Sequence, residues 1–503
     1  MSGEYGTVVS SVEGPSTRKF SFVIKKDASV RKGQFVEVAV DGGRIIGRVD
    51  DIFKTNRYFM RPESVEKYES SKPMEDIFPV SNWEYLVADV TPLGVYSKSE
   101  ESFQEVSFPP SPGTHVCSPD VQILARFLGL DEKGLEIGTL PHHDIKVRLN
   151  LTRLLQKHLA VLAISGAGKS YLMSVLIEEL LARKPEDGQV AVVIVDTHGE
   201  YTSFAKDKNY ADRVNVFSAS DIRVGLSGLS HHQLAEFLPK LSSVQIRELS
   251  RLFRDLKGEK IKNYTLAELI ETIEEDEKIK SGTKDVLMSI LEELGGTGLF
   301  GVSDYPNMDA LAVQGKIGII DLSQETSTQM KQMVVAHISR KLFNKRRAGE
   351  IPPFLLVVEE AHQFVPEGAK SEQALSRSIL RTIAREGRKF HASLCLISQR
   401  PIQLDTTTLS QCNTHIILRV TNPYDLDHIG KSSEGLNKEV LGQISGLRVG
   451  TGLIVGEAVN FPVFVKIRKR GSRDAETGLP LERAAVEYMN TAAQKRKDSR
   501  AFM

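Results

Sequence analysis

The chain has 503 residues, of which 41% are hydrophobic and 26% are charged, as is typical of a globular protein. This length exceeds that of one ordinary domain, so we expect about two or three domains. The 65 Lys and Arg residues balance the 65 Asp and Glu residues. The balanced charge excludes the class of strongly basic proteins that coat nucleic acid. Any contact with DNA must therefore come from a local basic surface.

The cysteine pattern is typical of a protein in a reducing compartment, and the hydropathy pattern predicts no membrane span. Cys117, Cys395 and Cys412 lie far apart and form no CxxC pair, so the sequence predicts neither a disulfide framework nor a zinc site. The longest apolar runs, such as 191–195 and 354–358, have the length of a strand, whereas a membrane span needs about 18 apolar residues. The amino terminus lacks the pattern of a signal peptide. We therefore expect a cytoplasmic protein that makes no contact with a membrane.

The amino-terminal part of the chain has the pattern of a small β-domain. Residues 1–100 contain short apolar strands separated by turn signals such as Gly14-Pro15. This pattern predicts a small antiparallel β-barrel. We expect residues 101–149 to be a linker that leads into the next domain, because the stretch 108–115 is rich in helix- and strand-breaking residues.

Residues 150–467 have the alternation of strands and helices that βαβ units require. Most of the predicted strands are continuous apolar runs, as expected for parallel strands that are covered on both faces. We therefore predict an α/β fold with a RecA-like P-loop core and a mostly parallel, doubly wound sheet. The predicted strands are residues 158–165, 190–196, 316–322, 354–360, 392–399, 414–420 and 452–458.

A charge-rich helical segment at about 229–300 interrupts this core. Thr265 and Glu268 have the spacing of a capping box that opens a helix, so we predict a helical insertion here. After the core, residues 468–503 contain two basic runs. Their composition fits a frayed basic tail as well as an arm that binds a neighbouring subunit or DNA.

The strongest chemical signal is a glycine-rich loop between an apolar strand and an amphipathic helix, at residues 159–182. Backbone N–H groups in such a loop, together with the amino terminus of the following helix, bind the phosphates of a nucleotide. The residues that we expect to bind ATP are Ser165, Gly166, Ala167, Gly168, Lys169, Ser170 and Tyr171.

Two residues of this loop have expected roles in the chemistry. Lys169 would reach the β- and γ-phosphates, and the hydroxyl of Ser170 would bind Mg²⁺. The usual pattern begins with glycine, where this chain has Ala163. The change is tolerable as long as that position does not need a positive φ.

Two acids at the end of a buried strand predict the second half of the site. Glu359 and Glu360 follow the apolar run 354–358 directly, and burial of both carboxylates without a cation would be costly. We expect Glu359 to belong to the Mg²⁺ shell. Glu360 would then orient the attacking water and take its proton.

Three further side chains are candidates for contact with the γ-phosphate. Gln399 ends the predicted strand 392–399, where a polar side chain can sense the phosphate. Arg381 and Arg385 lie four residues apart on one face of a predicted helix, and Arg388 adjoins them. A ring ATPase uses an arginine from the neighbouring subunit to stabilise the transition state, so we expect one of these arginines to be such a finger.

These motifs, in this order, resemble the HerA family of archaeal DNA-translocating ATPases within the larger HerA/FtsK group. The resemblance implies a homo-hexameric ring that moves double-stranded DNA through a central channel with energy from ATP. It also implies a partner nuclease of the NurA family and a role in processing DNA ends for recombinational repair. Asp196 and Glu200 match a family motif, but their roles stay open. The matching segments are residues 157–170, 196–201, 359–366, 385–390 and 398–401.

Two other functions are compatible with the same site. One is a ring motor that moves a cargo other than DNA, such as a protein. The other is a nucleotide-gated scaffold for a nuclease that hydrolyses little ATP. A scaffold would not need Glu360, and its presence favours an ATP-hydrolysing enzyme.

Overall fold

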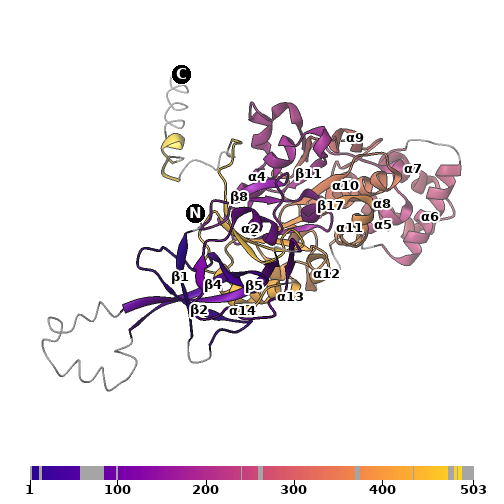
Figure 1. Ribbon diagram of the computed structural model, residues 1–503. Helices are drawn as coiled ribbons and strands as arrows, with labels where there is room; N and C mark the ends of the chain where they lie inside the picture. Colours follow the sequence, from indigo (N-terminus) through magenta and orange to yellow (C-terminus); the bar gives the residue numbers. More distant parts are fainter. Residues whose placement is uncertain are drawn as a thin grey trace, which may run out of the picture. The chain divides into compact units, whose positions relative to one another are not determined.

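The structure, a computed structural model, describes residues 3–10, 14–56, 84–97, 100–238, 241–258, 264–368, 374–433, 435–473, 481–483 and 485–489. The chain divides into two compact units (Figure 1). The first consists of residues 1–150 with 459–466, and the second of residues 151–458 with 467–503.

The first unit contains a closed antiparallel β-barrel, which confirms the barrel predicted from the sequence. Its strands, in spatial order, are β2 (Phe20–Ile24), β1 (Glu4–Val9), β7 (His115–Cys117), β3 (Phe35–Val40), β4 (Gly43–Asn56) and β5 (Glu84–Ser97). Pairing of β2 with β5 closes the barrel, and β6 (Ser102–Gln104) pairs with β5. Alternate side chains point inward, as in β2, where Phe20, Phe22 and Ile24 are buried in the core.

Residues 101–149, expected to be a linker, hold several folded elements of the first unit. Strand β7 completes the barrel between β1 and β3. Helix α2 (Val121–Leu128) begins at Asp120, whose carboxylate accepts two backbone N–H groups, and ends at Gly129 with a φ of 78°. Strands β8 (Leu135–Thr139) and β9 (Lys146–Leu149) form an antiparallel pair.

The second unit contains the predicted α/β core with a mostly parallel sheet, which is confirmed. The strands, in spatial order, are β12 (Val214–Ser218), β15 (Ile317–Asp321), β11 (Ala191–Asp196), β16 (Phe354–Val358), β17 (Ala392–Ser398), β10 (Leu159–Leu162), β18 (Thr414–Ile417) and β19 (Thr451–Gly456). All neighbouring pairs are parallel except β18 with β19. Every residue of β10, β11, β16 and β17 is buried, because helices cover both faces of the sheet.

The strand order decides where the functional residues meet. Strand β17 lies between β10, which leads into the glycine-rich loop, and β16, which leads into the acid pair. Parallel strands end at the same edge of a sheet, so the loops after β10, β17, β16 and β11 lie side by side. The main helices around this sheet are α4 (Lys169–Ala182), α10 (Thr328–Ala348) and α11 (Arg377–Phe390).

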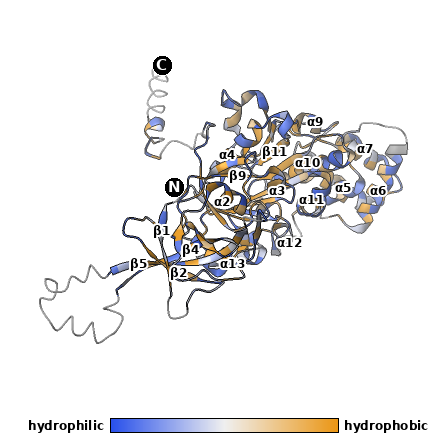
Figure 2. Ribbon diagram, viewed as in Figure 1, coloured by the Kyte–Doolittle hydropathy of each residue, from blue (hydrophilic) through white to orange (hydrophobic). Residues whose placement is uncertain are grey.

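The helical insertion consists of α5 (His231–Phe237), α6 (Ser243–Gly258), α7 (Leu266–Glu275) and α8 (Ser281–Gly295). The predicted capping box is confirmed: the N–H of Glu268 donates to the Thr265 hydroxyl, and the Glu268 carboxylate accepts from the Thr265 N–H at 2.6 Å. Hydrophilic and hydrophobic residues alternate along helices of the insertion such as α6, as is typical of amphipathic helices (Figure 2).

The remaining elements are short. They are α3 (Leu151–Leu155), β13 (Val224–Gly225), β14 (Phe300–Gly301), α9 (Met308–Leu311), α12 (Thr406–Leu409), α13 (Pro423–Ser432), α14 (Lys438–Ile444) and β20 (Val463–Ile467). Within the described part of the chain, no helix is both long and apolar enough to cross a membrane.

The start of the expected basic tail lies against the core. Residues 468–473 contact α4, where Arg468 forms ion pairs with Glu178 and Glu179 at 2.8 Å each. Residues 468–473 are therefore held against their own chain rather than frayed. The second basic run, residues 494–500, lies outside the described residues.

Candidate nucleotide site

The glycine-rich loop leaves the sheet at the end of β10 and is fixed by both neighbouring strands. The N–H of Ala163 donates to the carbonyl of Ser398 at 3.2 Å, and the N–H of Ile164 donates to the carbonyl of Arg419 at 3.0 Å. Gly166 and Gly168 have φ values of 73° and 98°, which side chains rarely adopt, and the space beside each is open. The loop therefore leaves its backbone accessible to phosphate oxygens.

The substitution of glycine by alanine at the start of the loop introduces no backbone strain. Ala163 is buried and does not belong to the residues with positive φ. The following helix, α4, begins at Lys169, whose side chain is largely buried, with 9% exposed. Its amino terminus places the partial positive charge of the helix at the loop.

A chain of two acids leads away from the hydroxyl of Ser170. That hydroxyl donates a hydrogen bond to Glu200, and Glu200 is in turn hydrogen-bonded to Glu359. Glu359 also accepts from the N–H and the hydroxyl of Thr197, both at 3.1 Å. Burial, the hydrogen bond with Glu200 and the charge of Asp196 raise the pKa of Glu359 to about 10. A cation beside such neighbouring buried acids would favour their charged forms.

The two acids whose roles the sequence left open have different surroundings. Asp196 is fully buried and accepts the N–H groups of four successive residues, 198–201, so it holds the turn after β11. Burial raises the pKa of Asp196 in spite of these hydrogen bonds. Glu200 reaches Ser170 and Glu359, and their hydrogen bonds outweigh burial and lower its pKa. Glu200, whose role the sequence left open, is thus a candidate site residue.

Glu360 occupies a buried position directly beside the loop. Its φ of 48° is unusual for a residue with a side chain, and such strain concentrates at functional sites. Burial raises the pKa of Glu360, whereas the charge of Lys169 and a hydrogen bond from Gln399 lower it. A carboxylate with a raised pKa is a suitable proton acceptor near neutral pH. The structure therefore brings Glu360, Gln399 and Lys169 together.

His362 contacts the same acid. Its Nδ1 lies 3.3 Å from the Glu360 carboxylate and 3.3 Å from the Ser398 hydroxyl. Burial and the positive charges of Arg400 and Lys169 lower the pKa of His362 to about 4. The imidazole is therefore neutral at neutral pH.

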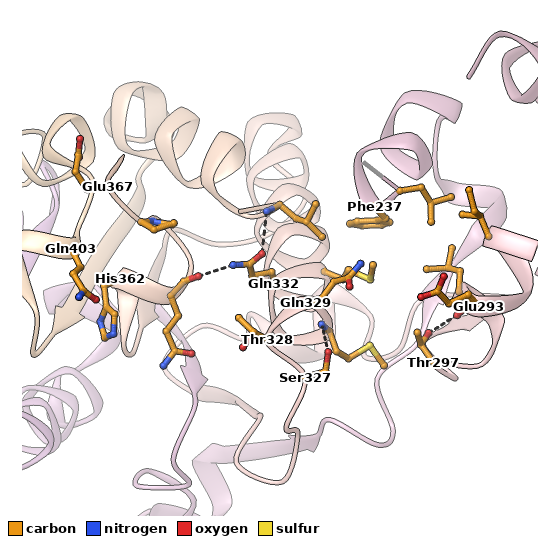
Figure 3. A pocket seen from close by; sticks show the side chains of 18 of the residues that line it. Phe237, Glu293, Thr297, Ser327, Thr328, Gln329, Gln332, His362, Glu367 and Gln403 are labelled. Carbon is orange, nitrogen blue, oxygen red and sulfur yellow. Dashed lines mark hydrogen bonds between the residues drawn. The ribbon is translucent and has the colours of Figure 1, made fainter. Parts of the chain in front are cut away.

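A cavity of about 1200 Å³ lies next to the loop that follows Glu360. In Figure 3, His362 lines one end of it, and Phe237 and Glu293 of the helical insertion line the other. Between these ends, the Gln332 amide donates to a backbone carbonyl of the His362 loop at 2.8 Å. The cavity thus connects the insertion with the loop that carries the proposed proton acceptor.

The candidate arginines differ in their surroundings. Arg381 forms two hydrogen bonds with the buried Asp405, at 3.0 and 2.6 Å, and Arg377 contacts the same carboxylate at 3.0 Å. Arg385 and Arg388 lie on the exposed side of α11. Arg381 is therefore held within its own chain, whereas Arg385 faces outward.

Tyr171, the last residue of the predicted loop motif, is bound by the carboxyl-terminal segment. Its hydroxyl accepts the N–H of Arg470 at 2.9 Å, and the Arg470 guanidinium lies 6.0 Å from the centre of its ring. Sequence reasoning did not predict this contact, because the two residues are 299 positions apart.

Comparison with known proteins identifies the family. Residues 135–342 match the model of the central domain of helicase HerA, and residues 8–98 match the HAS barrel domain. The DNA double-strand break repair helicase HerA of Pyrococcus furiosus is 30% identical, over 90% of this chain and 90% of that protein. This chain belongs to the HerA helicase family. The HerA helicase of Sulfurisphaera tokodaii is 27% identical, over 92% of this chain and 93% of that protein.

A solved structure has a similar fold. VirB4 of Thermoanaerobacter pseudethanolicus superposes with a TM-score of 0.53 at 18% identity, over 67% of this chain and 97% of that one. At this identity the similarity concerns the fold alone. As a member of the HerA family with a P-loop core, the chain is an ATPase that binds ATP.

Proposed function

We propose that this HerA-family ATPase is a homo-hexameric motor that moves along double-stranded DNA. The observation that carries the proposal is the meeting of Lys169, Glu360 and Gln399 at one edge of the sheet, beside Ser170 and its acids. This arrangement favours ATP hydrolysis over nucleotide binding alone. The reason is that the buried Glu360 can take the proton of the attacking water. The relatives named DNA double-strand break repair helicases favour DNA as the cargo.

The residues present fit a magnesium ion together with ATP. Such an ion uses one or two protein side chains together with phosphate oxygens and water, and Ser170 and Glu359 would supply these side chains. Glu200, hydrogen-bonded to both, would orient them. When bound, the ion would neutralise negative charge that develops on the phosphates.

The protein's own groups carry the remaining steps. The N–H groups of residues 166–170 and the amino group of Lys169 bind the phosphates. Glu360 accepts a proton from the attacking water, and Gln399 holds the Glu360 carboxylate in place by its hydrogen bond. His362, neutral and 3.3 Å away, restricts the other side of the same carboxylate.

Within the ring, we assign the arginine finger to Arg385. A finger must extend toward the ATP of the adjacent subunit, and Arg385 is exposed on α11. Arg381, another candidate, is held by Asp405 of its own chain. Arg381 would instead hold α11 in the orientation that presents Arg385.

Our proposal for the partner and the pathway rests on the resemblance to the family. We propose that the motor works with a NurA-type nuclease in the resection of DNA ends during recombinational repair. The name of the Pyrococcus furiosus relative, a double-strand break repair helicase, supports the pathway.

The test is steady-state ATP hydrolysis with and without linear duplex DNA, for the wild type and for Glu360→Gln. Stimulation by duplex DNA in the wild type, and its loss in the variant, are the expected results. Hydrolysis that is indifferent to DNA would overturn DNA as the cargo while leaving the ATPase intact. Absence of hydrolysis in the wild type, even with a NurA-type nuclease added, would instead favour the nucleotide-gated scaffold.

A further inference from the structure

The carboxyl-terminal segment 468–473 is fixed to the helix of the phosphate-binding loop by one buried acid. Glu178 of α4 is only 3% exposed, and its Oε1 accepts three donors: the N–H of Gly471 at 2.9 Å and the N–H and hydroxyl of Ser472 at 2.7 and 2.6 Å. Its other oxygen pairs with Arg468 at 2.8 Å. A buried carboxylate with so many donors fixes the course of the segment.

This anchoring brings Arg470 to the start of α4. The backbone N–H of Arg470 donates to the hydroxyl of Tyr171 at 2.9 Å, and its guanidinium lies 6.0 Å from the centre of the tyrosine ring. Tyr171 directly follows Ser170, the expected magnesium ligand. A planar cation and an aromatic ring, held by residues far apart in sequence, are therefore placed next to the phosphate-binding loop.

The direction in which ATP binds determines which part of the nucleotide lies near Tyr171 and Arg470. Lys169 reaches the β- and γ-phosphates, and Glu360 lies at the γ-phosphate. The loop amides bind the α- and β-phosphates, and the nucleoside extends from the α-phosphate, away from Glu360. Tyr171 begins the stretch of α4 beyond the phosphate ligands, so its side chain and the segment bound to it belong to the nucleoside side.

We propose that Tyr171 and Arg470 form the subsite that receives the nucleoside of ATP, and that Glu178 anchors the segment that completes it. The ligand chemistry is that of a planar, electron-rich base, which stacks on a guanidinium or an aromatic ring. The proposal rests on the nucleotide site described above and deepens it. It gives the segment 468–473 a function in binding ATP within its own subunit.

The experiment compares two ligands that differ by the nucleoside. The dissociation constants of ADP and of pyrophosphate are measured by calorimetry in Mg²⁺ and without DNA, for the wild type, Arg470→Ala and Tyr171→Phe. Lys469→Ala is the matched control, because it removes a positive charge from the same segment at an exposed position. Tyr171→Phe removes only the hydroxyl that holds Arg470, so it tests the proposal even where Arg470→Ala does not fold.

The expected result is a selective loss. Arg470→Ala weakens ADP binding by about tenfold, Tyr171→Phe weakens it by a smaller factor, and neither changes the affinity for pyrophosphate. Lys469→Ala binds both ligands as the wild type does. Unchanged ADP affinity in both variants, or an equal loss for ADP and pyrophosphate, would overturn the subsite. A wild type that binds neither ligand would refute the nucleotide site itself, which separates the two failures.

Discussion

The hydroxyl of Ser170, in the first turn of α4, donates a hydrogen bond to the carboxylate of Glu200, which lies 30 positions away in the turn after β11. Glu200 is also hydrogen-bonded to Glu359, the acid that directly follows β16. One carboxylate thus joins the two residues expected to bind magnesium. This relationship assigns to Glu200 a role that its position in the sequence does not reveal.

Replacement of Glu200 by Gln is expected to weaken the binding of Mg²⁺ and to slow ATP hydrolysis. The amide keeps the shape of the side chain but removes the charge that orients Ser170 and Glu359. Loss of such an orienting group reduces metal affinity or activity by roughly 10- to 100-fold. ATP hydrolysis titrated with Mg²⁺ should show a higher half-saturating concentration and a lower maximal rate.

The control for this variant is Glu186→Gln, which changes an exposed acid of the second unit. That control should behave as the wild type does. A Glu200→Gln variant with the magnesium dependence of the wild type would show that Glu200 contributes nothing to the site.

Arg385 and Arg381, two of the three candidate arginines of α11, should behave differently in a direct comparison. Arg385→Ala is expected to lower hydrolysis by about 10³-fold without a change in thermal stability or in ADP binding, because a finger acts only in the transition state. Arg381→Ala should instead lower the thermal midpoint, because it leaves the buried Asp405 with one fewer partner.

Mixing of subunits then tests whether Arg385 acts across the subunit boundary. Lys169→Ala subunits keep the arginine, and Arg385→Ala subunits keep the phosphate-binding loop. A mixture should recover part of the hydrolysis that each variant lacks alone. If the mixture stays inactive while wild-type subunits exchange freely, Arg385 does not supply the finger.

The lowered pKa of Asp405 makes the stability of the fold depend on pH. Burial alone would raise its pKa, but hydrogen bonds from Arg381, Thr408 and Arg377 outweigh burial and lower the pKa to about 2. Since the pKa is lower in the folded state, the stabilisation is fully present above the unfolded value of about 3.9 and is lost as the pH falls toward 2.

Comparison of the wild type with Asp405→Asn measures how much the Asp405 carboxylate contributes to the free energy of unfolding. The variant should be less stable by about 2 to 3 kcal/mol above pH 5, and this difference should shrink below pH 4. Asp427→Asn, in an exposed pair with Lys431, should cost less than about 1 kcal/mol. Urea unfolding at a series of pH values measures both. A difference between the wild type and Asp405→Asn that does not change with pH would contradict the assignment.

The core could be predicted from sequence because its strands carry their own signal. Runs such as 191–195 and 354–358 are continuously apolar, and strands buried on both faces require this. Strands β7 and β12 were not predicted. The first has only three residues, and the second is partly exposed, so each becomes a strand only through partners far away in the chain.

The site could be predicted only where its chemistry lies in a short motif. The loop at 165–171 and the acid pair after β16 are local patterns. The contact of Glu200 with Ser170, however, depends on how the sheet orders its strands. The difference between Arg381 and Arg385 likewise depends on Asp405, which lies 24 positions beyond Arg381 in another loop. Helical spacing alone makes the two arginines equivalent.

Displacement of a triplex-forming oligonucleotide from linear duplex DNA tests the central claim most directly. A motor that moves along the duplex removes the third strand without unwinding the other two. We predict ATP-dependent displacement by the wild type and none by Glu360→Gln, which keeps the fold of the site but lacks the proton acceptor. A wild type that binds the duplex and hydrolyses ATP, yet leaves the third strand in place, would contradict the assignment of this protein as a DNA translocase.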